Sequence, residues 1–395
     1  MLNSIIFSIY FYDKITRLQF LLGIIFLFFI FLKKRRIFLK KKFLFLFLII
    51  VIYSLIILTK NSYSYGKMLQ QSIVCGVIIL SYFNLFKYYS LKKIWNTYMK
   101  MGIIFSYLAI LQGIVYYLIQ VNIFIKPYNI WGLEKSYILA EKLIQVTSIA
   151  GEPGMFAQVL LPAVIFTLEK ILKRKKIRLN DIVILIAYLW TFTAIAFFSL
   201  GVYGIIKFMI LLKDKQLKNI LIFILILGIG SVLILSKIKT EAIERKIIES
   251  FNSILNFDTL NYYKLNLSSF ALFSNIKAAI NSNNYFLGNG FGSIEEVYYR
   301  YFLLKDHTFY GWNATDGYSL LVRIFSEFGI VGIILIVFYV LRNINLNKKE
   351  YYMRTINLSA LLGIISYFIR GGSYFMQGTI IFFLFLIFTK KPKRR

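Results

Sequence analysis

An arginine and a glutamate stand four positions apart within an apolar run late in the chain. Arg323 and Glu327 both lie in the run 318–341, and a charged side chain at membrane depth is costly unless it is paired or faces water. Residues at i and i+4 share one face of a helix. The spacing therefore predicts either a self-neutralising pair at the membrane interface or a catalytic pair at the mouth of a cavity.

Two further charged residues border apolar runs. Arg370 closes the run 355–369, and Glu152 opens the run 154–172 within the segment GEPGMFAQ. Arg370 is either a snorkelling anchor or a functional residue, because arginine is disfavoured on the outer side of a membrane. Glu152 is either a partner of the helix dipole or a catalytic carboxylate. Arginines on two helices, Arg323 and Arg370, would suit a diphosphate, since a guanidinium offers phosphate oxygens a planar fork of donors.

The only histidine, His307, precedes an aromatic stretch that ends before Asp316. Histidine is a common general base, so His307 and Asp316 are candidates for accepting the proton of an acceptor hydroxyl. Tryptophan combines an apolar face with a polar edge, which makes Trp312 a candidate platform for a sugar, with Arg300 as a substrate-binding cation. The alternatives are a solvated surface histidine and an aromatic belt at the membrane interface.

Three glycines stand close together in the sequence LGNGFGS. They are Gly288, Gly290 and Gly292, but a dinucleotide fingerprint would need glycine at Ser293 and a preceding strand, and no Walker sequence is present. One histidine and one cysteine in the whole chain make a zinc site improbable. We expect a tight turn that folds the loop back onto the membrane face, with these glycines as substrate-binding candidates, and we expect no cofactor and no metal.

The elements that must position these residues are apolar helices. Hydrophobic residues make up 59% of the 395 residues and the mean hydropathy is +0.70, which is typical of membrane proteins rather than soluble domains. The pattern predicts an all-α fold, a polytopic transmembrane helical bundle of about 10–12 spans with one large, external, partly helical loop. The expected spans are 18–32, 43–59, 68–86, 101–121, 154–172, 182–198, 201–212, 218–235, 318–341, 355–369 and 373–389.

Two apolar segments are shorter than a full span. Residues 201–212 would be the returning arm of a hairpin that turns at Ser199–Gly201, and residues 3–12 would form an extra interfacial segment. Residues 1–12 lack a basic n-region and a cleavage site, so the spans themselves are expected to direct insertion. Cys75 is the single cysteine, which excludes an intramolecular disulfide.

The formal charge of +30 is distributed as short basic clusters between the apolar runs. This distribution marks the cytoplasmic side of a membrane protein and does not predict a nucleic-acid partner. Alternating spans bring every cluster to one side, with the N-terminus outside and the C-terminus inside. The clusters lie within 33–42, 87–100, 173–178, 213–218, 342–354 and 390–395.

The segment 236–317 has a different charge balance. It holds eight basic and eight acidic residues, so we expect it to be external. The chain then divides into an N-terminal bundle of about eight spans over 1–235, an external cap over 236–317, and C-terminal transmembrane helices with a basic cytoplasmic tail over 318–395. Within the cap, helical periodicity predicts helices over 241–256 and 270–280.

About eleven spans, one large late external loop, the glycine turn LGNGFGS and the following span YSLLVRIFSEFGIVGIILIV occur here in that order. This order resembles the O-antigen polymerase and ligase (Wzy-type) membrane proteins. The segments GEPGMFAQVLLP, after a shorter external loop, and FFSLGVYGIIKFMILLK, in the hairpin, are also similar to that family. The resemblance covers most of the chain.

The resemblance implies a glycosyltransferase of polysaccharide biosynthesis, acting on lipopolysaccharide O-antigen or capsule. It would join polyprenyl-diphosphate-linked oligosaccharide repeat units on the external face of the bacterial inner membrane, with undecaprenyl diphosphate as the leaving group. External arginines hold the diphosphate in such proteins, which points to Arg323 and Arg370. Membrane lipid, a flippase and a chain-length regulator are the implied partners.

Three positions depart from the family pattern. Thr147 and Ser148 stand where an arginine often precedes the EP-like segment, Leu200 replaces an arginine after the hairpin serine, and Tyr318 occupies the region where ligases place a histidine. A ligase, which differs in its acceptor, and a lipid-linked oligosaccharide flippase or other transporter therefore stay as alternatives, although repeated halves typical of transporters are not apparent. The catalytic base is open among His307, Asp316, Glu327 and Glu152.

Overall fold

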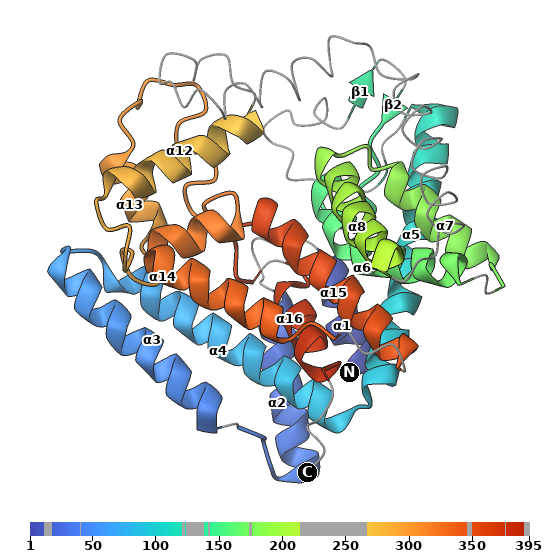
Figure 1. Ribbon diagram of the computed structural model, residues 1–395, viewed down its shortest axis with the longest axis horizontal. Helices are drawn as coiled ribbons and strands as arrows, with labels where there is room; N and C mark the ends of the chain where they lie inside the picture. Colours follow the sequence, from blue (N-terminus) through green and yellow to red (C-terminus); the bar gives the residue numbers. More distant parts are fainter. Residues whose placement is uncertain are drawn as a thin grey trace.

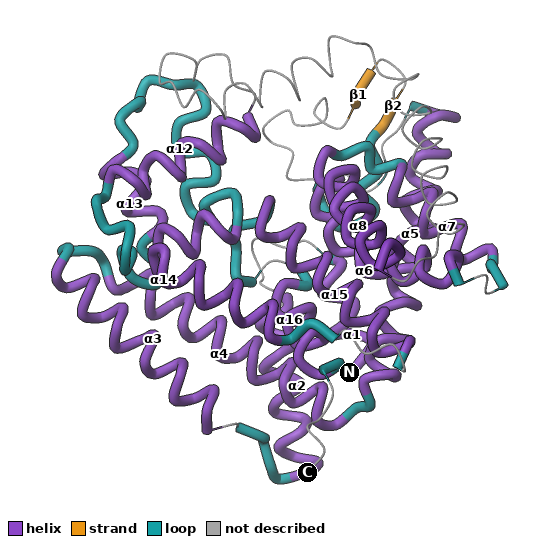
Figure 2. Tube along the Cα trace, viewed as in Figure 1, coloured by secondary structure: helices purple, strands orange, loops and turns teal. Residues whose placement is uncertain are grey.

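A computed structural model describes most of this chain, and helices dominate it (Figures 1 and 2). The described residues are 1–11, 18–39, 41–120, 123, 138–140, 143–173, 176–213, 267–345, 350–375 and 377–390. Within them lie thirteen helices and one short ribbon of two strands. The predicted all-α bundle is confirmed.

The helices of the first half and the ribbon precede the long loop. They are α1 (Leu2–Tyr10), α2 (Leu18–Lys34), α3 (Lys41–Lys60), α4 (Tyr65–Tyr88), α5 (Leu91–Ile119), β1 (Ile138–Ala140), β2 (Leu143–Ile144), α6 (Pro153–Leu172), α7 (Leu179–Leu189) and α8 (Ala194–Lys213). After the loop come α12 (Leu267–Asn281), α13 (Ile294–Tyr301), α14 (Leu320–Arg342), α15 (Tyr351–Ile369) and α16 (Thr379–Phe388).

Six of these helices, α3, α4, α5, α6, α14 and α15, are long and apolar enough to cross a membrane. Because several such helices pack into one bundle, the chain is a multi-pass membrane protein. Most expected spans within the described residues coincide with a helix. There are two exceptions: 182–198 crosses a turn, and 373–389 is helical only over Thr379–Phe388. The expected span 218–235 and the expected cap helix 241–256 lie outside the described residues.

Serine side chains begin three of the helices. Ser64, Ser90 and Ser319 each accept a hydrogen bond from a backbone N–H in the first turn of α4, α5 and α14. Such a cap satisfies one of the donors that a helix start leaves without a partner, so the sequence itself places these three starts.

The core is built around α6, which contacts α1, α5, α7, α8 and α15. Its side chains from Phe156 to Val164 are buried. Aromatic side chains extend this core toward the C-terminal helix, since Trp95 of α5 packs edge-on against Phe385 of α16, with ring centroids 5.1 Å apart. In Figure 1 the α6 region lies between α5 on one side and α15 on the other.

The bundle has a basic end, where several of the lysine and arginine clusters meet. The Tyr88 hydroxyl at the end of α4 donates to the carbonyl of Arg36 after α2, 2.7 Å away. At the start of α15, the Tyr351 hydroxyl donates to the carbonyl of Glu169 at the end of α6, also 2.7 Å away. Basic residues flank these contacts.

The opposite end carries the folded cap. Figure 1 shows α12 and α13 above the start of α14, far from the connection between α2 and α3. The predicted helix over 270–280 is confirmed as α12. The cap also rests on the connection between α3 and α4, because the Ser64 N–H donates to Glu296 at 2.9 Å and Lys67 pairs with Glu295 at 2.8 Å.

Two local expectations were wrong. The turn between α7 and α8 lies at Trp190–Thr193, and α8 continues unbroken through Ser199–Gly201, because the Tyr188 hydroxyl and the Ala196 carbonyl close the earlier turn with a 3.1 Å hydrogen bond. The first residues do not form an interfacial segment, since α1 is packed into the bundle with Ile6, Ile9 and Tyr10 fully buried.

Candidate functional site

The helix that carries Arg323 and Glu327 is interrupted at Gly329, two residues after Glu327. Gly329 has φ 63° and ψ −161° within α14, so the regular hydrogen bonds from Ile330 to Ser326 and from Val331 to Glu327 are lost. A broken helix at membrane depth is tolerated only where the freed backbone groups find other partners.

Those partners come from the glycine turn. The N–H groups of Asn289 and Gly290 donate to the carbonyls of Ser326 and Glu327 at 2.9 and 2.8 Å. In return, the N–H groups of Ile330 and Val331 donate to the carbonyls of Tyr285 and Phe286 at 2.8 and 3.3 Å. The segment from Tyr285 to Gly290 therefore inserts into the hydrogen-bond ladder of α14 and joins the cap to a membrane helix.

The glycines are required by this close approach. Gly288 has φ 80°, and a Cβ there would collide with backbone atoms of Glu327 and Phe328. Gly290 packs on Leu58 of α3, and Gly292 packs on the backbone of Met68 in α4. The predicted tight turn is present, and these three glycines face protein backbone and side chains, which explains their spacing without a substrate.

Arg323 lies at the centre of a buried polar cluster. Its side chain is 2% exposed, its Nε donates to Glu327 Oε1 at 3.1 Å, and its two Nη atoms donate to the Gly372 carbonyl at 3.3 Å and to Gln71 Oε1 at 2.6 Å. The guanidinium also stacks over the Tyr374 ring, 4.3 Å from the centroid. The cluster thus links α14, α4 and the segment after α15.

Glu327 is engaged on both carboxylate oxygens. Oε1 accepts from Arg323, and Oε2 accepts from the Tyr374 hydroxyl at 2.8 Å. The carboxylate is fully buried. The self-neutralising pair expected as one alternative is the arrangement that the structure contains, although it is buried in protein rather than held at the interface.

Arg370 and Glu152 form a second, more open pair. Arg370 ends α15 and Glu152 precedes the first turn of α6, and their side chains are 32% and 37% exposed with Nη2 and Oε2 3.5 Å apart. The guanidinium lies against Gly154, where an added Cβ would come within 2.9 Å of Nη1. Two of the candidates from distant parts of the sequence are therefore brought together at the cap end of the bundle.

Hydrogen bonds hold the backbone at Arg370, although its side chain is partly exposed. Gln158 of α6 donates to the carbonyls of Ser366 and Arg370 at 3.0 and 2.5 Å. The next residue, Gly371, donates to the carbonyl of Tyr318 at 2.6 Å. Arg370 also lies over the Tyr318 ring at 5.9 Å, so α6, α15 and the start of α14 converge at this residue.

The Asp316 carboxylate stabilises the turn that precedes α14. Its Oδ1 accepts from the Asn313 side chain at 3.1 Å and from the Tyr318 N–H at 3.0 Å, which fixes a turn immediately before the helix. Its carbonyl lies so close to Gly372 that any side chain at Gly372 would collide with it. Asp316 therefore lies beside the segment that follows Arg370, with its carboxylate used in the turn.

His307 is neither solvated nor beside these pairs. It is 6% exposed and stacks on Phe270 of α12, with centroids 3.9 Å apart and an interplanar angle of 11°. Its Nδ1 accepts from the Phe309 N–H at 3.1 Å. The histidine is part of the aromatic core of the cap.

The same core includes Tyr298 of α13. Burial raises the pKa of the Tyr298 hydroxyl, so the hydroxyl stays neutral while it accepts from the Gly311 N–H at 3.1 Å. Trp312, the residue after Gly311, is not part of this core: it is 45% exposed on the cap surface.

Arg300 braces the cap against the membrane helices. It donates to the carbonyls of Asn61 and Ser62 at 2.9 and 2.7 Å and lies 4.5 Å above the Tyr63 ring. These contacts hold the connection between α3 and α4. They give Arg300 a defined role at the base of the cap, separate from Arg370.

Sequence reasoning did not find several residues that complete these clusters. Gln71 and Tyr374 are partners of the buried pair, and no local pattern distinguishes them from other polar residues in apolar runs. A buried ion pair between Glu169 of α6 and Lys207 of α8 at 2.5 Å was also missed. Glu169 and Lys207 stand inside apolar runs, so the criterion applied to Arg323 would have found them.

The fold and the polar clusters define a class, a multi-pass helical membrane protein with charged side chains at one end of its bundle. Comparison of the chain with protein-family models, with curated proteins and with solved structures finds no match. The chemistry of the site therefore carries the functional argument.

Proposed function

We propose that this protein is a membrane glycosyltransferase of the polysaccharide-polymerase type, which transfers oligosaccharides from a polyprenyl diphosphate. The observation that carries the proposal is the pair of Arg370 and Glu152, whose side chains are 32% and 37% exposed, flank two different helices and lie 3.5 Å apart. Transfer from a diphosphate donor needs a cation for the leaving group and is helped by a base for the acceptor. The pair supplies both groups.

Arg370 is the group for the diphosphate. Its guanidinium offers a planar fork of donors and lies against Gly154 in the first turn of α6. The first N–H groups of a helix also attract anions. A diphosphate would replace Glu152 as the partner of Arg370, while the carboxylate turns toward the acceptor.

Glu152 is the group for the acceptor. The acceptor hydroxyl oxygen forms a bond to the anomeric carbon of the donor, and its proton passes to the Glu152 carboxylate. The bond between that carbon and the diphosphate oxygen breaks, and its electron pair leaves with the diphosphate. Arg370 stabilises the charge that develops on this oxygen, and no further reactant is required.

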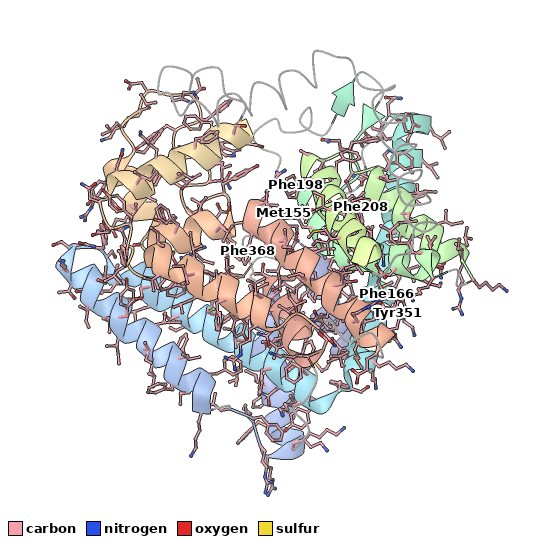
Figure 3. The ribbon with its side chains drawn as sticks, viewed as in Figure 1. Met155, Phe166, Phe198, Phe208, Tyr351 and Phe368 are labelled. Carbon is pink, nitrogen blue, oxygen red and sulfur yellow. The ribbon has the colours of Figure 1, made fainter. Side chains whose placement is uncertain are left out.

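Apolar side chains border the pair, as a lipid-linked donor would require. Figure 3 labels Met155 of α6, Phe198 of α8 and Phe368 of α15, which lie in the first or last two turns of three helices that pack on one another. Met155 follows Gly154 directly, and Phe198 is 52% exposed. An isoprenoid chain extending from a diphosphate at Arg370 would meet apolar surface here.

The basic end of the bundle suggests the orientation. Lysine and arginine clusters stay on the cytoplasmic side, so the cap and Arg370 would lie on the external face of a bacterial inner membrane. A donor that has been flipped across the membrane would reach the pair from that face.

The proposal is tested in cells whose polymer depends on this protein. Arg370→Ala and Glu152→Gln are expected to abolish long chains, while single repeat units accumulate on the lipid carrier. Polymer length is measured on gels, and the amount of protein in the membrane by immunoblot. Long polymer in Arg370→Ala cells would overturn the proposal.

Lys67→Ala is the matched control. Lys67 is an exposed cation that pairs with Glu295 at 2.8 Å at the same end of the bundle, and its loss is expected to leave chain length unchanged. If instead the Arg370 variant keeps full-length chains that fail to reach their final acceptor, the protein is a ligase. The two outcomes separate the polymerase from its nearest alternative.

A further inference from the structure

Arg323 is the most completely buried arginine of the described residues, and yet its contacts lead to Arg370. Its Nη1 donates to the carbonyl of Gly372 at 3.3 Å, two residues after Arg370. Its guanidinium also stacks on Tyr374, 4.3 Å from the ring centroid. Both contacts fall on the short segment that leaves α15 at Arg370.

The other contacts of this segment lead to the same helix. Gly371 donates to the Tyr318 carbonyl at 2.6 Å, and the Ser319 hydroxyl donates to the Phe368 carbonyl at 2.5 Å. Together with Arg323, these bonds tie the residues on both sides of Arg370 to α14 and to the two residues that precede it. Arg370 itself is extended, with φ −141° and ψ 138°, so the direction of its side chain depends on where the following residues are held.

We infer that Arg323 is a positioning residue for Arg370 and does not itself bind the diphosphate. The inference rests on the proposed function for its ligand, because the substrate class is a polyprenyl diphosphate at Arg370. Arg323 holds the segment 371–374 against α14, and this fixes where the Arg370 guanidinium points. Lysine cannot replace Arg323, since it lacks the planar fork that reaches three acceptors while stacking on a ring.

The first test does not depend on a substrate. Phenylglyoxal modifies accessible arginines, and mass spectrometry of the full-length protein in detergent reports the rate at each one. Arg370 is expected to react and Arg323 to be protected. In Arg323→Lys, the rate at Arg370 is expected to change severalfold, while the rate at Arg300, a solvent-exposed reference at the base of the cap, stays constant.

The control variant is Arg354→Lys. Arg354 lies in the first turn of α15, at the end of the helix opposite Arg370, so this substitution makes the same chemical change without touching the segment 371–374. If Arg323→Lys loses cooperative unfolding, Tyr374→Leu replaces it, because that change removes the ring on which the Arg323 guanidinium stacks and leaves the ion pair of Arg323 with Glu327 in place. An unchanged Arg370 rate in folded variants of both kinds would overturn the inference.

The second test uses farnesyl diphosphate as a short probe of the donor. Arg323→Lys is expected to weaken its binding to the purified protein by roughly tenfold or more, as displaced catalytic groups commonly do. In an Arg370→Gln background the same substitution is expected to have no further effect, because Arg323 acts through Arg370. An equal loss in both backgrounds would show an independent role and overturn the inference.

The two tests fail in different ways. If the wild-type protein does not bind farnesyl diphosphate, or binds it equally after Arg370→Gln, the proposed function is wrong. The phenylglyoxal rates alone then decide whether Arg323 positions Arg370. If binding of farnesyl diphosphate depends on Arg370, but Arg323→Lys changes neither the phenylglyoxal rate at Arg370 nor the affinity for the probe, the proposed function stands and the positioning role is wrong.

Discussion

Two arginine–glutamate pairs lie at the cap end of the bundle and differ in almost every physical respect. Arg323 and Glu327 belong to one helix, are 2% and 0% exposed, and have neutral and backbone partners on every side. Arg370 follows α15 and Glu152 precedes α6, their side chains are about one-third exposed, and they lie 3.5 Å apart. The sequence presents the first pair more plainly, because it shows a helical spacing.

The difference shows what burial does to a charged pair. Buried partners must satisfy one another, since an unpaired charge in an apolar interior is strongly destabilising. A partly exposed pair contributes little to stability and can exchange one partner for a ligand. The buried pair is therefore suited to holding the structure together, and the open pair to binding and chemistry.

The largest effect is expected from breaking the buried pair. Glu327→Leu leaves Arg323 buried without its carboxylate and is expected to lower the free energy of unfolding by about 3–5 kcal/mol. Glu152→Leu is expected to lower it by at most about 1 kcal/mol. Unfolding of both variants in detergent, followed by intrinsic fluorescence, measures the contrast, and equal losses would remove the distinction between the pairs.

The glycine turn that supports the buried pair is expected to show the next largest effect. Gly288→Ala places a Cβ against the backbone of Glu327 and Phe328 at φ 80°, with an expected loss of about 1–3 kcal/mol from backbone strain alone. Gly201→Ala in α8 is the control, since an added Cβ has nothing within 4 Å. A thermal shift assay compares the two, and a Gly288 variant as stable as the Gly201 variant would contradict the inserted turn.

A double-mutant cycle measures the coupling within each pair. For Arg370 and Glu152 the expected coupling is about 0.2–1 kcal/mol, as for other exposed pairs. It should also weaken as salt is raised, because the charges are in contact with solvent. A coupling of several kcal/mol that is insensitive to salt would mean that this pair is structural too.

The smallest effect on stability, but a clear effect on activity, is expected from Gly154→Ala. The added Cβ would come within 2.9 Å of the Arg370 guanidinium, which is the flexible end of a side chain and can move aside. Alanine favours a helix over glycine by up to about 1 kcal/mol, so stability should be unchanged or slightly higher. Polymer length is expected to fall, and normal chains in this variant would argue against a site at Arg370.

Hydropathy and periodicity were sufficient for most of the fold. The apolar runs gave the helices because a continuous run of this length can satisfy its backbone only as a helix in a membrane, and α12 followed from its local pattern. The turn between α7 and α8 was misplaced because single serine and glycine residues such as Ser199 and Gly201 are tolerated within a helix. Turn signals are weak where every residue is apolar.

The site was predicted less completely. The members of both pairs, Arg370, Glu152, Arg323 and Glu327, were singled out as candidates, because charges beside apolar runs are rare and their cost is local. The sequence could not tell which pair is buried and which is open, since the exposure of each charged side chain depends on residues of other helices. His307 was expected near an acceptor, and its stacking on Phe270 depends on a contact across 37 residues that no spacing reveals.

What the sequence by itself determined is an all-helical membrane bundle with a cap late in the chain and a small set of charged candidates. These follow from the length and hydropathy of consecutive residues, which are local quantities. Only the tertiary structure decided that the glycine turn enters the broken ladder of α14, that Arg323 is enclosed, and that Arg370 meets Glu152. Burial and partnership are properties of segments brought together from distant parts of the chain, and the packing of the helices alone sets them.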